Sequence, residues 1–158
     1  SRIPIFAPLS DVETEKLAAA SKVKVYAPGE AIVRMGQEGN SMFVIVRGSV
    51  NVEIPDPSGT KVVNKLVEND FFGEMSLLTG QPRSATVPAA EETEVMQIGK
   101  NAIRPIFEAN PDVVSSIVAI IDERRTALKA TIAAGEEDAE KTSLGVIRSI
   151  KKFFGLRD

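Results

Sequence analysis

The 158-residue sequence contains neither cysteine nor histidine. The absence of cysteine excludes disulfide frameworks, thiol catalysis and thiolate-bound zinc. The absence of histidine excludes Ser-His-Asp catalysis, Cys-His catalysis and imidazole-ligated metals. A metal ion would therefore have to be held by carboxylates and carbonyls, as calcium and magnesium are. We find no carboxylate cluster, and so expect no metal site.

Long apolar runs and an excess of positive charge are also missing. The longest strongly apolar stretches extend over about five residues, against the roughly 20 that a membrane-spanning helix needs. No basic-then-apolar targeting pattern is present. The formal net charge is −3, from 22 acidic and 19 basic residues, whereas nucleic-acid-binding domains are usually basic. Nucleic acid is therefore not expected as a partner. Because the chain begins at Ser1 without a methionine, we expect a piece of a longer protein.

The composition is that of an ordinary soluble globular protein, with 43% hydrophobic and 26% charged residues. The length is typical of a single domain, and a chain of this size buries roughly 68–70% of its unfolded surface. We expect one domain over residues 1–134. Residues 135–158 are expected to form a charged linker and a short basic amphipathic segment.

Periodicity predicts a helix first and then strands. Ser10 and Glu13 have the spacing of a capping box at the start of a helix over about residues 10–20. Alternation of apolar and polar residues then predicts strands at 23–27, 31–34, 42–47, 49–54, 61–68, 85–88 and 94–98. Short strands separated by turn signals every eight to twelve residues are typical of a sandwich or barrel.

Helical spacing returns after the last strand. Asn101 is expected to cap a helix to about Ala109, and Pro111 suits the first turn of the next helix, which Gly135 would end. The sequence therefore predicts a helix, about eight strands and two helices, followed by an amphipathic segment over residues 144–156.

One segment, residues 71–87, carries a pattern that points to an anion. Gly73 and Gly80 bracket a very short helix, and Gly73 lets the backbone approach a ligand without a Cβ in the way. The backbone N–H groups of Glu74, Met75 and Ser76 would point out of the helix start, where an anion is favoured.

Two charged residues complete this pattern. Arg83 follows the short helix, and its planar, two-pronged donor suits a phosphate. Glu74 cannot bind phosphate, but it can accept hydrogen bonds from sugar hydroxyls. One anion, one sugar and one enclosed barrel together indicate a nucleotide.

This segment closely resembles the phosphate-binding cassette of cyclic-nucleotide-binding domains, whose pattern is Phe-Gly-Glu, a short leucine-containing helix, and Pro-Arg-Ser/Thr-Ala-Thr-Val. Residues 29–30, 36–45 and 48 are similar to the strand-and-turn signature of the same family, and the resemblance covers about residues 5–134. It implies a mainly β fold with flanking α, an eight-stranded β-jelly-roll barrel with an N-terminal helix. The C-terminal helices would move when cyclic AMP or cyclic GMP binds.

The resemblance also implies a role for each cassette residue. Arg83 would hold the cyclic phosphate and Glu74 the ribose 2′-hydroxyl. The resemblance further implies contacts from the backbone N–H groups of Gly73, Met75 and Ser76. Ser84 would contribute its backbone and its hydroxyl. Arg124 matches the arginine that stacks over the base in some bacterial channel relatives, and Arg125 is the alternative.

Leu77, Ile103 and Phe107 are expected to be core residues, and in similar domains the cassette leucine also touches the hinge before the last helix. We therefore assign these three residues a coupling role. Gly36 and Gly39 are expected to serve only as turn residues.

The Ser84 hydroxyl is compatible with both nucleotides, and no second guanine-specific group is evident. Cyclic AMP is favoured because similar bacterial domains use it, with cyclic GMP as the alternative. Without histidine or a carboxylate cluster we expect a binding module and no catalytic residue. A degenerate domain that serves only in assembly is a further alternative, against which the Glu74–Arg83 pair argues.

Three contexts are compatible with such a domain. Transcription regulators add a helix-turn-helix module, for which the roughly 24 residues after residue 134 are too few. Kinase regulatory subunits carry tandem copies and an inhibitory basic segment, neither of which we find in this sequence. Residues 3–10 and 146–156 resemble the C-terminal domain of bacterial cyclic-nucleotide-gated channels of the small-conductance mechanosensitive superfamily. That resemblance implies a cytoplasmic domain of an inner-membrane protein, a homo-oligomer attached to a channel pore domain.

The closing segment, residues 144–156, has basic residues beside its apolar stripe. A basic amphipathic helix can lie on an anionic membrane surface. Packing on its own domain or on a neighbour is the alternative.

Overall fold

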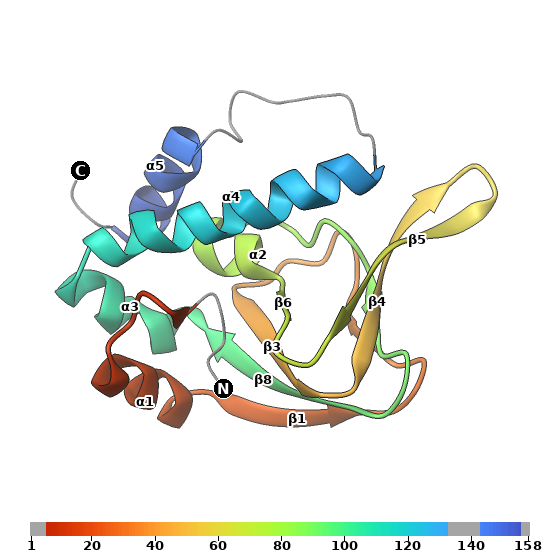
Figure 1. The fold of residues 1–158 in the computed structure, drawn as a ribbon, viewed down its shortest axis with the longest axis horizontal. Helices are drawn as coiled ribbons and strands as arrows, with labels where there is room; N and C mark the ends of the chain where they lie inside the picture. The colour runs from red at the N-terminus through yellow and green to blue at the C-terminus, as the bar shows by residue number, and fades with distance from the viewer. Residues whose placement is uncertain (1–5, 133–142, 156–158) are drawn as a thin grey trace.

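The computed structural model describes residues 6–132 and 143–155; for residues 124–132, 143–146, 148 and 149 it describes the backbone alone. The helices are α1 (Asp11–Ala19), α2 (Glu74–Thr79), α3 (Lys100–Ala109), α4 (Asp112–Ile132) and α5 (Ser143–Phe154). The strands are β1 (Lys22–Tyr26), β2 (Ala31–Val33), β3 (Ser41–Arg47), β4 (Ser49–Asp56), β5 (Gly59–Val67), β6 (Phe71–Phe72), β7 (Val87–Pro88) and β8 (Thr93–Gly99). Figure 1 shows α2, α3, α4 and α5 gathered on one side of the strands.

The strands close into a barrel of two antiparallel sheets. One sheet has the order β1-β8-β3-β6, and the pairs β2-β7 and β4-β5 make up the other. Isolated bridges from Val50 to Ala89 and from Glu53 to Thr86 join β4 to the segment around β7. The second sheet therefore runs β2-β7-β4-β5, and the expected eight-stranded jelly roll is confirmed.

Strand β3 separates two apolar clusters because successive side chains of a strand point to opposite faces. Phe43 and Ile45 lie in the cluster that fills the barrel, whereas Met42 and Val44 lie in the cluster between the sheet and the helices. The barrel cluster consists of Val33, Phe43, Ile45, Val50, Leu66, Phe72, Val87 and Val95. Strand β3 thus connects the interior of the barrel to the helical side of the fold.

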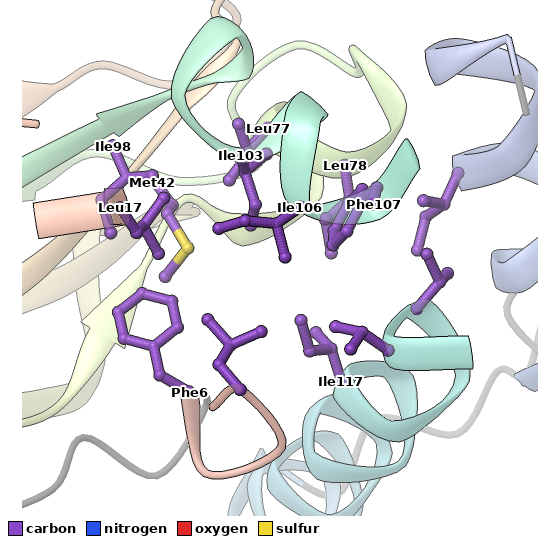
Figure 2. Packing of buried hydrophobic residues seen from close by; sticks show 14 of the residues in the cluster. Phe6, Leu17, Met42, Leu77, Leu78, Ile98, Ile103, Ile106, Phe107 and Ile117 are labelled. Carbon is purple, nitrogen blue, oxygen red and sulfur yellow. The ribbon is translucent and has the colours of Figure 1, made fainter. Parts of the chain in front are cut away.

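The helix-side cluster brings together residues that are far apart in the sequence. Figure 2 shows Leu17 from α1 beside Met42 and Ile98 from the sheet, and Ile103 and Phe107 from α3 beside the leucines of α2. Ile117 of α4 closes the cluster from the opposite side. Motion of α2, α3 or α4 therefore disturbs one shared core.

Helix α5 belongs to this core as well. It contacts α2 and α4, and its Ile150 and Phe154 are fully buried. The Phe154 ring meets Phe107 edge-on at 5.0 Å between centroids, and Lys100 Nζ lies 3.7 Å from the centroid of the Phe153 ring. The apolar face of the closing segment is thus packed on its own domain. The expected boundary at residue 134 lies outside the described residues.

Two local predictions meet different outcomes at the helix starts. The capping box is confirmed, because Ser10 Oγ accepts a hydrogen bond from Glu13 N–H at 3.1 Å and Glu13 Oε1 accepts one from Ser10 N–H at 2.9 Å. The cap at Asn101 is wrong: α3 begins at Lys100 with Gly99 as N-cap. Lys100 N–H donates to Asn40 O at 3.1 Å, so a tertiary partner replaces a side-chain cap.

Strand β6 was not among the predicted strands. It has two residues, too few to show an alternating pattern, and it exists because Phe71 and Phe72 pair with Val44 and Phe43 of β3. Within the described ranges, no helix has the length and apolar character needed to cross a membrane.

Candidate functional site

The short helix α2 is bracketed by glycines, as predicted. Gly73 (φ +80°) and Gly80 (φ +77°) have left-handed backbones that are open to glycine at little cost. The first hydrogen bond of the helix runs from Leu77 N–H to Gly73 O at 3.3 Å. The N–H groups of Met75 and Ser76 precede this bond and so have no partner within the helix.

Arg83 is the buried cation beside this helix, with 7% of its surface exposed. Its Nη1 donates to Ser41 O at 2.7 Å and to Gly73 O at 3.3 Å, and its Nη2 donates to Ser41 Oγ at 3.1 Å. These acceptors are all neutral. Of the five guanidinium N–H donors, the one on Nε and the second on Nη2 have no acceptor among the described residues. Nε and Nη2 form one edge of the guanidinium, which is thereby left for a ligand.

The backbone of Arg83 is held as firmly as its side chain. Arg83 N–H donates to Gln37 O, and Gly36 N–H donates to Arg83 O, both at 2.8 Å. The Cζ atom of Arg83 also lies 5.6 Å from the centroid of the Phe43 ring, within the range of a cation–π contact. The turn before β3 thus holds both the backbone N–H and the backbone C=O of Arg83.

The electrostatics of the site favour an anion. Burial lowers the pKa of the Arg83 guanidinium from its ordinary value, and the carboxylate of Glu74 partly opposes this shift. The guanidinium nevertheless stays charged, because arginine does not deprotonate in proteins. A buried charge is costly unless it is paired, so an anion on the Nε–Nη2 edge would be bound favourably.

Two glycines leave room for this arginine. A Cβ at Gly39 would lie 2.6–2.7 Å from Nε, Cζ and Nη2 of Arg83, and a Cβ at Gly73 would lie 2.8 Å from Nη1. The interpretation of Gly39 as only a turn residue is therefore wrong, because its missing side chain is what admits the guanidinium. Gly36 has φ +87°, and a Cβ at this position would meet nothing within 4 Å, which agrees with a turn role.

The remaining cassette residues lie around α2 and Arg83. Ser76 is buried, Met75 is half-buried against the helix-side cluster, and Ser84 is exposed. Arg124 and Arg125 belong to α4, but their side chains lie outside what the structure describes. Their expected role over the base therefore stays a prediction.

The three residues expected to couple ligand to helices share one buried cluster. Leu77, Ile103 and Phe107 have at most 1% of their surface exposed, and Figure 2 shows Leu77 of α2 next to Ile103 of α3. Their expected core position is confirmed. A change at α2 has a direct packing route to α3 through them.

Sequence reasoning missed three residues around Arg83: Ser41, Phe43 and Gln97. Gln97 Nε2 donates to Ser41 Oγ at 3.2 Å, and Ser41 in turn accepts twice from Arg83. Only closure of the barrel brings β3 and β8 to the segment after α2. The available signal was that Ser41 and Gln97 are polar positions in phase with buried apolar residues of their strands.

Comparison with known proteins agrees with this site. Residues 23–110, more than half of the chain, match the family model described as the cyclic nucleotide-binding domain. The chain belongs to the cyclic nucleotide-binding domain family.

Relatives in this family have several effectors. The chain is 39% identical over 92 residues to a cAMP-dependent protein kinase regulatory subunit of Mycosarcoma maydis, covering 58% of this chain and 18% of that protein. It is 31% identical over 125 residues to a cyclic nucleotide-gated potassium channel of Mesorhizobium japonicum, covering 79% and 34%. The chain thus spans about a third or less of these relatives.

The fold is shared with solved structures. The N-terminal domain of a transcriptional regulator from Streptomyces coelicolor superposes with a TM-score of 0.67 at 25% identity, covering 87% of this chain and 96% of that one. Channels, kinase subunits and transcriptional regulators are therefore all represented among its relatives.

Proposed function

We propose that this domain binds cyclic AMP and that binding moves its C-terminal helices to gate an attached ion channel. The observation that carries the proposal is the Nε–Nη2 edge of the Arg83 guanidinium. The guanidinium is buried and charged, and its other N–H groups donate to neutral oxygens. This edge matches two oxygens of one phosphate group.

The other contacts follow from the surroundings of Arg83. The phosphate takes the backbone N–H groups at Gly73, Met75 and Ser76, which begin α2. Glu74 accepts from the ribose 2′-hydroxyl, and Ser84 adds its backbone and hydroxyl. The ligand is thereby bound by its charge and its sugar at one end of the barrel.

Ligand can shift the helices only if it binds one arrangement more tightly than another. We propose that Arg124, with Arg125 as the alternative, covers the base only when α4 is closed over the barrel. Helix α4 lies above α2 and reaches β5, a path compatible with this role. Leu77, Ile103 and Phe107 would transmit the change from α2 to α3. By linkage, opening of the effector would in turn change nucleotide affinity.

The channel context is favoured by the longer alignment. Similarity to the channel extends over 125 residues, against 92 and 114 residues for two kinase regulatory subunits. In this proposal the domain is cytoplasmic, belongs to an inner-membrane protein and assembles as a homo-oligomer beside a pore domain. Flux through liposomes that contain the full-length protein tests it, since a rise on addition of cyclic AMP is expected and no response would reject it.

Isothermal titration calorimetry tests the binding proposal. The wild-type domain should bind cyclic AMP more tightly than cyclic GMP. Arg83→Leu removes charge-assisted hydrogen bonds worth about 1.5–3 kcal/mol each, so affinity should fall by at least roughly one to two decades, the equivalent of one such bond. Arg47→Leu is the matched control, because Arg47 is an exposed arginine that pairs with Glu94. Wild-type affinity in Arg83→Leu would reject Arg83 as the phosphate ligand.

We also propose that the domain binds the nucleotide without turning it over. Incubation with cyclic AMP should yield no AMP by chromatography. Within the described residues no three acidic side chains gather where a metal ion could be held. Release of AMP by the wild-type domain and its loss in Arg83→Leu would replace the binding role with an enzymatic one.

A further inference from the structure

Gln97 is a polar residue on the face of β8 that points into the barrel. It lies on β8 opposite Phe43 of β3, in phase with Val95, which is fully buried in the barrel cluster. The residues of that cluster are aliphatic or phenylalanine. A long polar amide at this position therefore needs a physical reason.

The amide of Gln97 is only half satisfied. Its Nε2 donates to Ser41 Oγ at 3.2 Å, whereas its Oε1 is buried without a hydrogen-bond partner among the described residues. In this orientation one end of the amide is therefore buried and unpartnered. Such a group destabilises the fold relative to an apolar residue of the same size.

What Gln97 does supply is a fixed orientation of Ser41. Ser41 has 5% of its surface exposed, and its Oγ accepts from Gln97 Nε2 and from Arg83 Nη2. A serine hydroxyl has two acceptor positions, so both are in use. The hydroxyl is thereby held as an acceptor toward Arg83.

We propose that Gln97 is a positioning residue for the phosphate site. It acts through Ser41 Oγ, which holds Nη2 of Arg83 so that the Nε–Nη2 edge faces the ligand. This inference rests on the proposed cyclic nucleotide binding and adds to it a residue of β8, outside the 73–84 segment.

Gln97→Met separates this role from a merely structural one, because it keeps the length of the side chain and removes the amide. Affinity for cyclic AMP should fall roughly three- to ten-fold, as expected for loss of one hydrogen bond to the network. The urea midpoint of unfolding should stay the same or rise, since the unpartnered amide is gone. A residue that only supports the fold would not give a weaker ligand site in an equally stable protein.

Two further variants test the route. If Gln97 acts through Ser41, the double variant Ser41→Ala/Gln97→Met should bind no more weakly than Ser41→Ala alone. Gln97→Glu places a carboxylate near Arg83, and its loss of affinity should shrink as the pH is lowered and the carboxyl is protonated.

Thr93→Val is the matched control on the same strand and face. Thr93 is fully buried, and its hydroxyl donates to Ser49 O at 2.9 Å and lies 2.8 Å from Glu91 O. The variant should lower stability and leave nucleotide affinity unchanged.

The outcomes distinguish the two proposals. A wild-type domain that binds neither cyclic AMP nor cyclic GMP overturns the proposed function, and the role of Gln97 with it. Binding by wild type together with unchanged affinity in Gln97→Met overturns the role of Gln97 alone. Additive losses in the Ser41→Ala/Gln97→Met cycle would show that Gln97 does not act through Ser41, and would also overturn it.

Discussion

Gly39→Ala is the most discriminating single substitution, because it adds one methyl group directly against the guanidinium of Arg83. The new Cβ would lie 2.6 Å from Nε and 2.7 Å from Nη2, whereas ordinary contact begins at 3.4 Å. The guanidinium must therefore retreat by about 0.8 Å. The backbone of Gly39 is not among those with positive φ, so the substitution introduces the contact without backbone strain.

The retreat should weaken ligand binding more than it weakens the fold. Arg83 is a long side chain whose far end can move, but movement away from Gly39 disturbs the 2.7 Å bond to Ser41 O and the 3.1 Å bond to Ser41 Oγ. Loss of about one charge-assisted hydrogen bond to phosphate corresponds to roughly 1.5–3 kcal/mol, or about ten- to a hundred-fold in dissociation constant.

Calorimetry with cyclic AMP and urea unfolding together measure the two effects. Gly36→Ala is the matched control from the same turn, since its methyl meets nothing within 4 Å but its φ of +87° strains any other residue. We expect Gly39→Ala to lose affinity and Gly36→Ala to lose stability. If Gly39→Ala binds cyclic AMP as wild type does, the position of Arg83 does not determine affinity and the reasoning fails.

Two further predictions concern the core and the pH. Phe154→Ala should lower the free energy of unfolding in urea by about 3–5 kcal/mol, because Phe154 is 1% exposed and packs edge-on against Phe107. A measured loss below about 1 kcal/mol would mean that α5 is not part of the core in solution. Affinity for cyclic AMP should be nearly constant from about pH 6 to 9. The chain has no histidine, and carboxylates titrate below this range. Burial lowers the pKa of Arg83, but the guanidinium stays charged. A tenfold change in the dissociation constant by titration across that interval would point to an unrecognised ionisable group at the site.

The parts of the fold that follow from neighbouring residues were predictable. The Ser10–Glu13 capping box uses groups three residues apart, and Gly73 and Gly80 end α2 through their own backbone conformations. Alternation of apolar residues located the longer strands, since an alternating run is visible within five or more residues. The positions of Glu74 at the start of α2 and of Arg83 after it were likewise inferred from a contiguous segment.

The predictions that failed depended on partners elsewhere in the chain. The cap at Asn101 is wrong because Lys100 N–H donates to Asn40 O, which directly precedes the neighbouring strand β3. Strand β6 has no pattern of its own and depends on pairing with β3. Gly39 looked like a turn glycine because nothing in its neighbourhood shows that Arg83, 44 residues later in the sequence, would occupy the space of its side chain.

By itself the sequence determined the Ser10–Glu13 capping box, the strands long enough to alternate, and a contiguous segment with the donors for an anion, because these depend on contacts between residues close in the chain. Only the tertiary structure decided that Ser41 bonds to both Arg83 and Gln97, that the missing side chain of Gly39 leaves space for the guanidinium, and that α5 packs against the helix-side core. Barrel closure and helix docking bring these groups together, and such long-range contacts leave no periodic trace in a single sequence.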